Sequence, residues 1–393
     1  MAVGLLVATG TAWAFLKGAK DFEVFYHAWT LVLAGSASEI YSQGPDRYLY
    51  APGFAWLFSP LAFLPKTLAL TIWTMVKTVS LGLLIRRLAS ALAPQNVAAL
   101  GLVCLAALFT ARPILIDFEY GQVNLFTLAI ALWALLDFYS ERRNATFSFL
   151  AWFFLGIAAV TKLFTLPLLI IPFLNAPLVS SQRRAEKWGS VAGVLLMILG
   201  PAIFLNAGGS LYLNWRDALI AKGFPTESHN QSFLAFLHHY LSGNATAVLS
   251  EAGIDYHFGA RIFSAEVLRW LGWAWFFGTL GILVGWIFSM PARFKLSWLA
   301  VLIGLLILPS HLIWKPYFVF SFPLFLAVMQ KFSRTANFAW GWVGLTSLAF
   351  VLNLSGFDVL GHPASAHLEA FAVFLWVHLA LMVWVRAIDR LEI

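Results

Sequence analysis

Long apolar runs separated by short polar breaks dominate the chain. A transmembrane helix needs about 20 mostly apolar residues, and shorter helices are tolerated inside a bundle. The segment 52–65 is too short and too rich in proline to span, so we expect it to lie in the membrane interface. The remaining runs predict about twelve spanning helices, near residues 2–16, 67–85, 94–111, 121–139, 146–161, 163–179, 188–208, 265–289, 297–311, 315–330, 337–354 and 368–386.

Basic residues concentrate in alternate short connections between these runs. Lysine and arginine in short loops mark the cytoplasmic side of a membrane protein. We therefore predict that both termini are cytoplasmic and that the opposite, outer face carries the functional site. The connections assigned to the inside contain Arg86, Arg87, Arg142, Arg143, Arg183, Arg184, Lys187, Arg293, Lys295, Lys331, Arg334, Arg386 and Arg390.

Two long outer segments, 17–66 and 209–264, interrupt this pattern. Loops longer than about 12–15 residues are usually functional or disordered. These two are rich in Trp, Tyr, His, Asp and Asn, which favours ordered elements at a membrane surface. The predicted architecture is thus an all-α polytopic membrane protein, with a single transmembrane domain over residues 1–393 and two elaborated outer elements.

Composition supports this fold class and excludes others. Hydrophobic residues make up 61% of the chain and charged residues 11%, less than half the charge typical of soluble domains. The net charge of +7 sits in short clusters between apolar runs, so we predict no nucleic-acid partner. One cysteine and nine histidines without metal-ligand spacing predict no metal site. Without a phosphate-binding or dinucleotide motif, we expect no cofactor.

Asp21 is the first candidate functional residue. It follows the first apolar run directly and begins an aromatic stretch with helical spacing. As a helix N-cap this aspartate would be ordinary. As a carboxylate held at the membrane surface it would suit a general base. Both interpretations are open at this point, and the aromatic stretch comprises Phe22, Phe25, Tyr26 and Trp29.

A second set of polar residues lies at the start of the apolar run 121–139, on the predicted outer side. Its amides can satisfy backbone donors at a helix start. Four polar side chains at one cavity mouth would instead suit sugar hydroxyls, and the sequence does not decide between the two. The group contains Arg112, Asp117, Glu119, Tyr120, Gly121, Gln122 and Asn124.

Further candidates lie later in the chain. Lys162 interrupts an apolar stretch and can either extend to lipid headgroups or hold a lipid phosphate. The motif SHNQS contains Asn230 and Gln231. In PSHLIWKPY, His311 and Lys315 are four residues apart in apolar surroundings. His238 and His239 are interpreted as structural residues.

Six sequence blocks, in order from about residue 20 to about residue 330, resemble the family 87 glycosyltransferases of the GT-C superfamily. Tyr50-Ala51-Pro52 stands where many members read Tyr-Pro-Pro. The blocks are Asp-Phe-x-Val-Phe-Tyr-x-Ala from Asp21, Tyr-x-x-x-x-Asp-Arg-Tyr-x-Tyr-Ala-Pro from Tyr41, GQVNLFTLAIALWAL, AAVTKLFTLPLLIIPF, SHNQSFLAFL and PSHLIWKPYFVFSFPLFL.

The resemblance implies transfer of a sugar, typically mannose, from a polyprenyl-phosphate donor to a glycolipid or glycan acceptor outside the cytoplasmic membrane. It also implies that Asp21 is the base. The chemistry is consistent with the residues present. A sugar phosphate has a good leaving group, so inverting transfer needs one carboxylate to take the acceptor proton and cations or donors to stabilise the departing phosphate.

The sequence therefore assigns three roles to numbered residues. Asp21 is predicted as general base. Lys162, His311 and Lys315 are predicted to meet near the donor phosphate. Contacts to sugar or acceptor are predicted for Gln122, Asn124, Asn230 and Gln231.

Two other functions are compatible with the same apolar composition. A lipid-linked sugar flippase or secondary transporter should show polar or broken helices near the bilayer midplane, often in paired halves. Here the polar residues gather at predicted outer ends, and the two halves show no internal symmetry. A membrane assembly subunit without chemistry is the third alternative.

Overall fold

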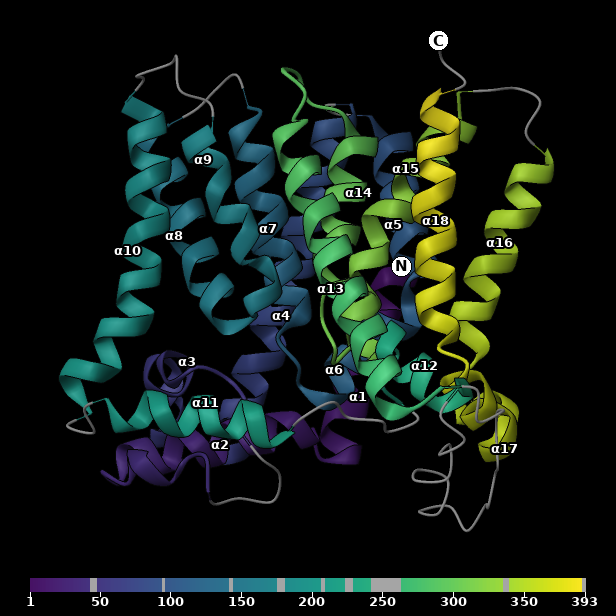
Figure 1. Cartoon of the computed structure of the whole chain (residues 1–393). Coiled ribbons are helices and arrows are strands. Elements are labelled where there is room, and N and C mark those ends of the chain that lie inside the picture. The colour runs from purple at the N-terminus through teal and green to yellow at the C-terminus, as the bar shows by residue number, and fades with distance from the viewer. Residues whose placement is uncertain are drawn as a thin grey trace. The chain divides into compact units, whose positions relative to one another are not determined.

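The computed structural model describes helices throughout (Figure 1). No strand occurs in its described residues, which confirms the prediction of an all-α chain. Residues 43–47 of the first predicted outer segment, and residues 223–228 and 242–262 of the second, lie outside the described residues. The described residues are 1–42, 48–93, 96–140, 144–174, 181–205, 209–222, 229–241, 263–334 and 339–390.

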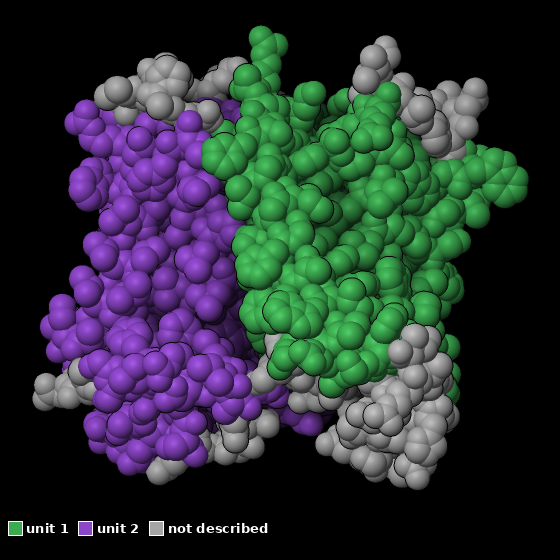
Figure 2. Space-filling model, viewed as in Figure 1, with its two compact units in different colours: residues 1–6, 92–116, 224–393 green, residues 7–91, 117–223 purple. Residues whose placement is uncertain are grey.

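The helices form two compact units, which Figure 2 shows in different colours. Two compact units can belong to one domain, so the single domain over residues 1–393 stays a prediction. Unit 1 comprises Met1–Leu6, Leu92–Ile116 and Phe224–Ile393, and unit 2 comprises Val7–Ala91 and Asp117–Gly223.

Unit 2 contains the first outer segment and the helices that follow it. Helices α1 (Ala2–Lys17) and α6 (Ala111–Tyr120) begin in unit 1 and end in unit 2. The other elements of unit 2 are α2 (Lys20–Leu33), η1 (Ala37–Glu39), α3 (Pro52–Phe58), η2 (Ser59–Phe63), α4 (Lys66–Leu92), α7 (Asn124–Phe138), α8 (Ala145–Thr161), η3 (Leu163–Ile170), α9 (Ile171–Leu174), α10 (Ser181–Phe204) and α11 (Ser210–Lys222).

Helix α2 buries the aromatic face that the sequence pattern predicts. Aromatic residues at helical spacing place Phe22, Phe25 and Trp29 on one side, and all three are buried. Their rings pack against Phe54 from α3 and Trp73 from α4, with centroid separations of 5.1–6.3 Å. This aromatic core fixes the first outer segment to the helices beneath it.

Parts of the two predicted outer segments come together in unit 2. Helices α2, α3 and α11 lie at one end of the long helices α4 and α10 (Figure 1). The indole Nε1 of Trp215 in α11 donates a hydrogen bond to the carbonyl of Leu49, 3.0 Å away. Residues 52–65 form only the short helices α3 and η2, consistent with the expectation that this segment does not span.

Glycines let α8 and α10 approach closely. A Cβ atom added at Gly193 would lie 2.1 Å from the Phe153 carbonyl oxygen, and one at Gly156 would lie 2.6 Å from the Ser190 oxygen. Small residues at a helix interface permit such close backbone contact in membrane proteins. The two helices are therefore closely packed along these glycines.

Unit 1 is built around α14 and α15, which are almost entirely buried. His378 joins three elements at this core: its Nδ1 lies 2.7 Å from Ser321 Oγ, and its Nε2 lies 3.0 Å from the Gly304 oxygen. The elements of unit 1 are α5 (Val97–Phe109), α12 (Phe233–Leu241), α13 (Ala265–Phe288), α14 (Leu296–Ile307), η6 (Lys315–Ser321), α15 (Phe322–Phe332), α16 (Ala339–Leu354), α17 (Phe357–Ala370) and α18 (Val373–Arg390).

The described helices fit a membrane protein but do not fix the number of spans. Helices α4, α10 and α13 are each long and apolar enough to cross a membrane, and three bent pairs could add three more. The bent pairs are α1–α2 (63°), α5–α6 (66°) and the end of α17 with α18 (54°). Several predicted spans are shorter apolar helices, so the count of twelve stays a prediction.

Membrane orientation can be tested by cysteine labelling. In a Cys104→Ala background, Ala221→Cys in α11 should react with an impermeant thiol reagent added outside intact cells. Ser181→Cys at the start of α10 should react only after the membrane is permeabilised, because its connection carries the basic residues typical of the inside. Both positions are exposed in the structure. The reverse labelling pattern would overturn the predicted orientation.

Candidate active site

Asp21 lies in the first turn of α2, directly after the bend from α1. The bend uses two left-handed residues, Gly18 (φ 86°) and Ala19 (φ 42°). Ala19 occupies the N-cap position, and α2 has no side-chain cap hydrogen bond. The N-cap interpretation of Asp21 is therefore wrong. Its carboxylate instead accepts a hydrogen bond from the side-chain amide of Gln122, with 2.6 Å between Nε2 and Oδ2.

Gln122 links Asp21 to an aromatic residue and a lysine. The Tyr50 hydroxyl donates to Gln122 Oε1 at 2.8 Å. Lys162 Nζ lies 4.8 Å from the centre of the Tyr50 ring, within the range of a cation–π attraction. These four side chains, Asp21, Tyr50, Gln122 and Lys162, form what we call the Asp21 cluster. It brings a carboxylate and an ammonium group into one contiguous set of contacts.

Glu23, the nearest competing carboxylate, faces a different partner. It pairs with Lys66, and the two side chains are 46% and 44% exposed. Residues two apart on a helix point about 200° from each other, so Asp21 and Glu23 cannot face the same group. Asp21 is the α2 carboxylate that belongs to the cluster.

Lys162 is held inside unit 2. It is the C-cap residue of α8, where the α-helix gives way to the 3-10 helix η3. The residue is 6% exposed, so its side chain packs within the protein rather than extending along the surface to lipid headgroups. The ammonium group of Lys162 lies over the ring of Tyr50.

The turn between α6 and α7 is fixed by Asp117. One carboxylate oxygen, Oδ2, accepts from the backbone N–H of Asn124 at 3.2 Å. The other, Oδ1, lies 2.7 Å from Nζ of Lys77 in α4. Glu119, the second acid of this turn, pairs with Lys17 at 3.0 Å. The turn is thus tied to two other helices, while the predicted sugar contact of the buried Asn124 stays a prediction.

Asn230 and Gln231 organise a junction in unit 1. The Asn230 side chain donates to the His311 carbonyl at 3.0 Å and accepts from the Ile313 N–H at 3.0 Å. Gln231 Nε2 donates to the Glu369 carbonyl at 2.7 Å. Both amides are buried and bound to backbone groups, so they hold the segment that carries His311. Their proposed sugar contacts are not tested.

His311 and Lys315, four residues apart in the chain, both belong to unit 1. His311 is exposed, but the surrounding protein partly desolvates its imidazole and lowers its pKa below 6.5. Near neutral pH it can therefore offer an N–H hydrogen bond rather than a full charge. Lys315 pairs with Glu369 and lies 5.9 Å from the Phe374 ring. Because Lys162 belongs to unit 2, a phosphate shared by all three residues stays a prediction.

Comparison with protein families decides what kind of protein carries this cluster. The model of glycosyltransferase family 87 matches residues 48–309, about two thirds of the chain. The chain belongs to glycosyltransferase family 87. This confirms the resemblance seen in the sequence and makes the chain a membrane glycosyltransferase. Asp21, His311 and Lys315 lie outside the matched range. No curated protein and no solved structure matches the chain.

An apolar groove in unit 2 of this family 87 chain adjoins the Asp21 cluster. It has a volume of about 780 Å³ and is lined by α3, η2, α4, α7 and α8. Three lining residues connect the groove to the cluster: Trp73, Val123 and Thr161. Trp73 Nε1 donates to the carbonyl of Gly121 at 2.8 Å, and the other two are sequence neighbours of Gln122 and Lys162.

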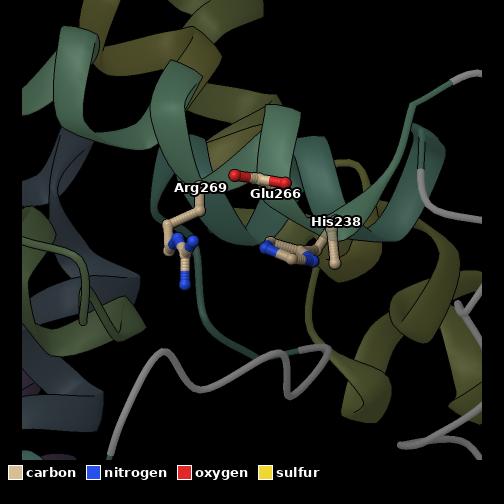
Figure 3. Close-up of a pocket in the computed structure, with 4 residues that line it drawn as sticks. His238, Glu266 and Arg269 are labelled. Atoms are coloured by element: carbon tan, nitrogen blue, oxygen red, sulfur yellow. The ribbon is translucent and has the colours of Figure 1, made fainter.

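A second, smaller cavity lies in unit 1. Its volume is about 370 Å³, and Figure 3 shows His238 of α12 beside Glu266 and Arg269 of α13. Burial and the neighbouring His239 lower the pKa of His238. The His239 ring lies within hydrogen-bond distance of the Ala370 carbonyl, at 3.1 Å, consistent with its structural interpretation. Neither histidine belongs to the Asp21 cluster.

Two residues of unit 2 were missed by the sequence analysis. Tyr50 was quoted as part of a motif without a role, although it contacts both Gln122 and Lys162. Lys77 was overlooked inside an apolar run. An ionisable residue within a span is a functional candidate by default, and that signal could have found it.

Proposed function

We propose that this family 87 chain transfers mannose from polyprenyl-phosphate mannose to an acceptor hydroxyl on the outer face of the cytoplasmic membrane. Asp21 is the general base. It takes the proton of the acceptor hydroxyl while that oxygen bonds to the anomeric carbon of the sugar. The bond from this carbon to the phosphate oxygen breaks, and the polyprenyl phosphate leaves with the electron pair. Attack from the face opposite the phosphate inverts the anomeric configuration.

The observation that carries this proposal is the hydrogen bond between Gln122 and Asp21 within a cluster that also contains Lys162. A general base must be held within reach of the proton that it removes. A buried cation can stabilise the charge that develops on the departing phosphate. The cluster supplies one carboxylate and one ammonium group, which is the set that transfer from a sugar phosphate requires.

The apolar groove supports a lipid-linked donor. Its lining residues on α4 run from Ile72 to Arg87, a length of about 22 Å at 1.5 Å per residue. The hydrocarbon core of a membrane is about 30 Å thick. A polyprenyl chain in this groove would stay at the depth that it occupies in the bilayer, with its phosphate at the end near Lys162.

A pair of valines on α4 tests the groove. Val76 lines it and is 48% exposed, whereas Val79 is 58% exposed and does not line it. Val76→Trp should fill part of the groove and raise the KM for polyprenyl-phosphate mannose about tenfold, the loss of roughly 1.4 kcal/mol of binding. The measurement is mannose transfer by purified protein in lipid vesicles at varied donor concentration.

Val79→Trp is the matched control, because it adds the same volume to the same helix outside the groove. Its KM should stay close to that of the unchanged protein. Equal effects of the two substitutions would contradict the groove as the donor site. Transfer from a nucleotide-linked mannose in place of the lipid-linked donor would contradict the proposed donor class itself.

A further inference from the structure

Helix α4 carries a lysine that is completely buried. The side chains of Lys77 and Asp117 are both 0% exposed, and Lys77 Nζ lies 2.7 Å from Asp117 Oδ1. The same ammonium group donates a hydrogen bond to the backbone carbonyl of Asp117 at 2.5 Å. Ionisable residues inside membrane-spanning helices are costly and mark function by default. This pair therefore requires an explanation beyond packing.

One face of α4 holds the turn between α6 and α7. Trp73 lies one helical turn before Lys77 and donates to the carbonyl of Gly121. The Asp117 carbonyl that receives the lysine also accepts the backbone N–H of Gln122 at 2.9 Å. The two α4 side chains thus bind the carbonyl groups of Asp117 and Gly121, and Gln122, which follows Gly121, donates its backbone N–H to the first of these carbonyls.

The same turn is pressed against α2 beside the proposed base. Gly121 has φ 70°, and a Cβ atom there would lie 2.6 Å from Cβ of Phe22. Phe22 follows Asp21 directly in the chain. The contact leaves little space between turn and helix, so the position of the turn sets the direction from which the Gln122 amide reaches the Asp21 carboxylate.

We propose that Lys77 and Asp117 are positioning residues for the general base. They fix the turn so that Gln122 orients the Asp21 carboxylate toward the acceptor hydroxyl. This inference rests on the proposed function, in which Asp21 is the base. Misplacing a catalytic group by about 1 Å can lower a rate a hundredfold. Holding the turn in place should therefore raise the rate of transfer.

Replacing both members of the pair by apolar residues separates positioning from stability. A buried ion pair exchanged for hydrophobic residues of similar volume is often neutral or stabilising, whereas removal of one partner leaves an uncompensated charge. Lys77→Met/Asp117→Leu should therefore still fold, with a loss of thermal stability limited to that of the hydrogen bond from the Asn124 N–H to the Asp117 carboxylate. Its kcat should fall about ten- to hundredfold, with the KM for polyprenyl-phosphate mannose nearly unchanged.

Two further measurements identify the route of the effect. In a Gln122→Ala background the double substitution should cause little additional loss of kcat, because residues that act through one another are not additive. Hydrogen exchange should show faster exchange of the Gln122 backbone N–H, because its acceptor, the backbone carbonyl of residue 117, is no longer held by Lys77. Exchange in α8 should stay unchanged.

The matched control is a second buried ion pair in unit 2, Arg183 with Glu186 on α10, 3.2 Å apart. Arg183→Met/Glu186→Leu should leave kcat unchanged. A Lys77→Met/Asp117→Leu protein with normal kcat, or with a loss that adds fully to that of Gln122→Ala, would overturn the positioning role, as would unchanged exchange at Gln122. Asp21→Asn, assayed alongside, reports separately on the proposed function: if it retains transfer, the base assignment fails, while the exchange result still reports on the turn.

Discussion

Asp21→Asn is expected to lower the rate of sugar transfer about a hundredfold or more in a protein that still folds and binds its donor. Asparagine keeps the size of the side chain but lacks the basic carboxylate that accepts the proton. Because Ala19 and not Asp21 is the N-cap of α2, any loss of stability should stay within about 1 kcal/mol. The measurement is transfer from polyprenyl-phosphate mannose, with thermal unfolding and donor binding measured on the same protein.

Glu23→Gln is the matched control, since Glu23 lies on the same helix and pairs with Lys66. Its transfer rate should change little. Near-normal transfer by Asp21→Asn would refute the base, and a large loss in Glu23→Gln alone would move the base two residues along the chain. Lipid-linked sugar movement that persists in Asp21→Asn without any chemical transfer would favour the flippase instead.

The sequence pattern predicted the local elements near the proposed base well. The helical spacing of the aromatic residues after the first apolar run predicted a helix, which the structure confirms as α2; three of these residues, Phe22, Phe25 and Trp29, are buried, and Tyr26 is not. The segment 52–65 was expected not to span, and it forms only the short helices α3 and η2. These features are set by residues close together in the chain, so periodicity is sufficient to reveal them.

Contacts between distant residues could not be predicted in this way. The hydrogen bond of Gln122 to Asp21 joins residues 101 positions apart, and the ion pair of Lys77 with Asp117 joins residues 40 positions apart. The residues that surround each partner in the chain do not indicate which distant residue it will contact. The capping interpretation of Asp21 failed for a related reason: α2 begins one residue earlier, at Lys20, after two residues with positive φ.

Side-chain burial and contacts add information on Asn230, Gln231 and Lys162 that the sequence alone does not contain. The sequence predicted sugar or acceptor contacts for Asn230 and Gln231, and these contacts stay a prediction. In the structure both amides are buried and hydrogen-bonded to the backbone. The sequence allowed Lys162 either to extend to lipid headgroups or to hold a lipid phosphate; its burial and its contact with Tyr50 argue against the first, and the second stays a prediction. Amide and lysine side chains are chemically versatile, so only their surroundings distinguish these roles.

Removal of the Lys162 charge is the second change expected to have a large effect. Lys162→Gln should lower transfer from the lipid-linked donor about a hundredfold, similar to the loss of one preorganised donor that stabilises a developing negative charge. Lys162→Arg, which keeps a positive charge in the same place, should recover part of the rate. Transfer kinetics at saturating donor, together with donor binding, are the measurements.

Lys66→Gln provides the control for general loss of positive charge in unit 2, because Lys66 is 44% exposed and pairs with Glu23. Its rate should remain close to normal. If Lys162→Gln keeps the normal rate, the lysine has no part in phosphate departure, and its buried contact with Tyr50 is structural. If Lys162→Gln and Lys162→Arg lose equal activity, shape rather than charge governs the position, because a guanidinium retains the charge but spreads it over a larger planar group.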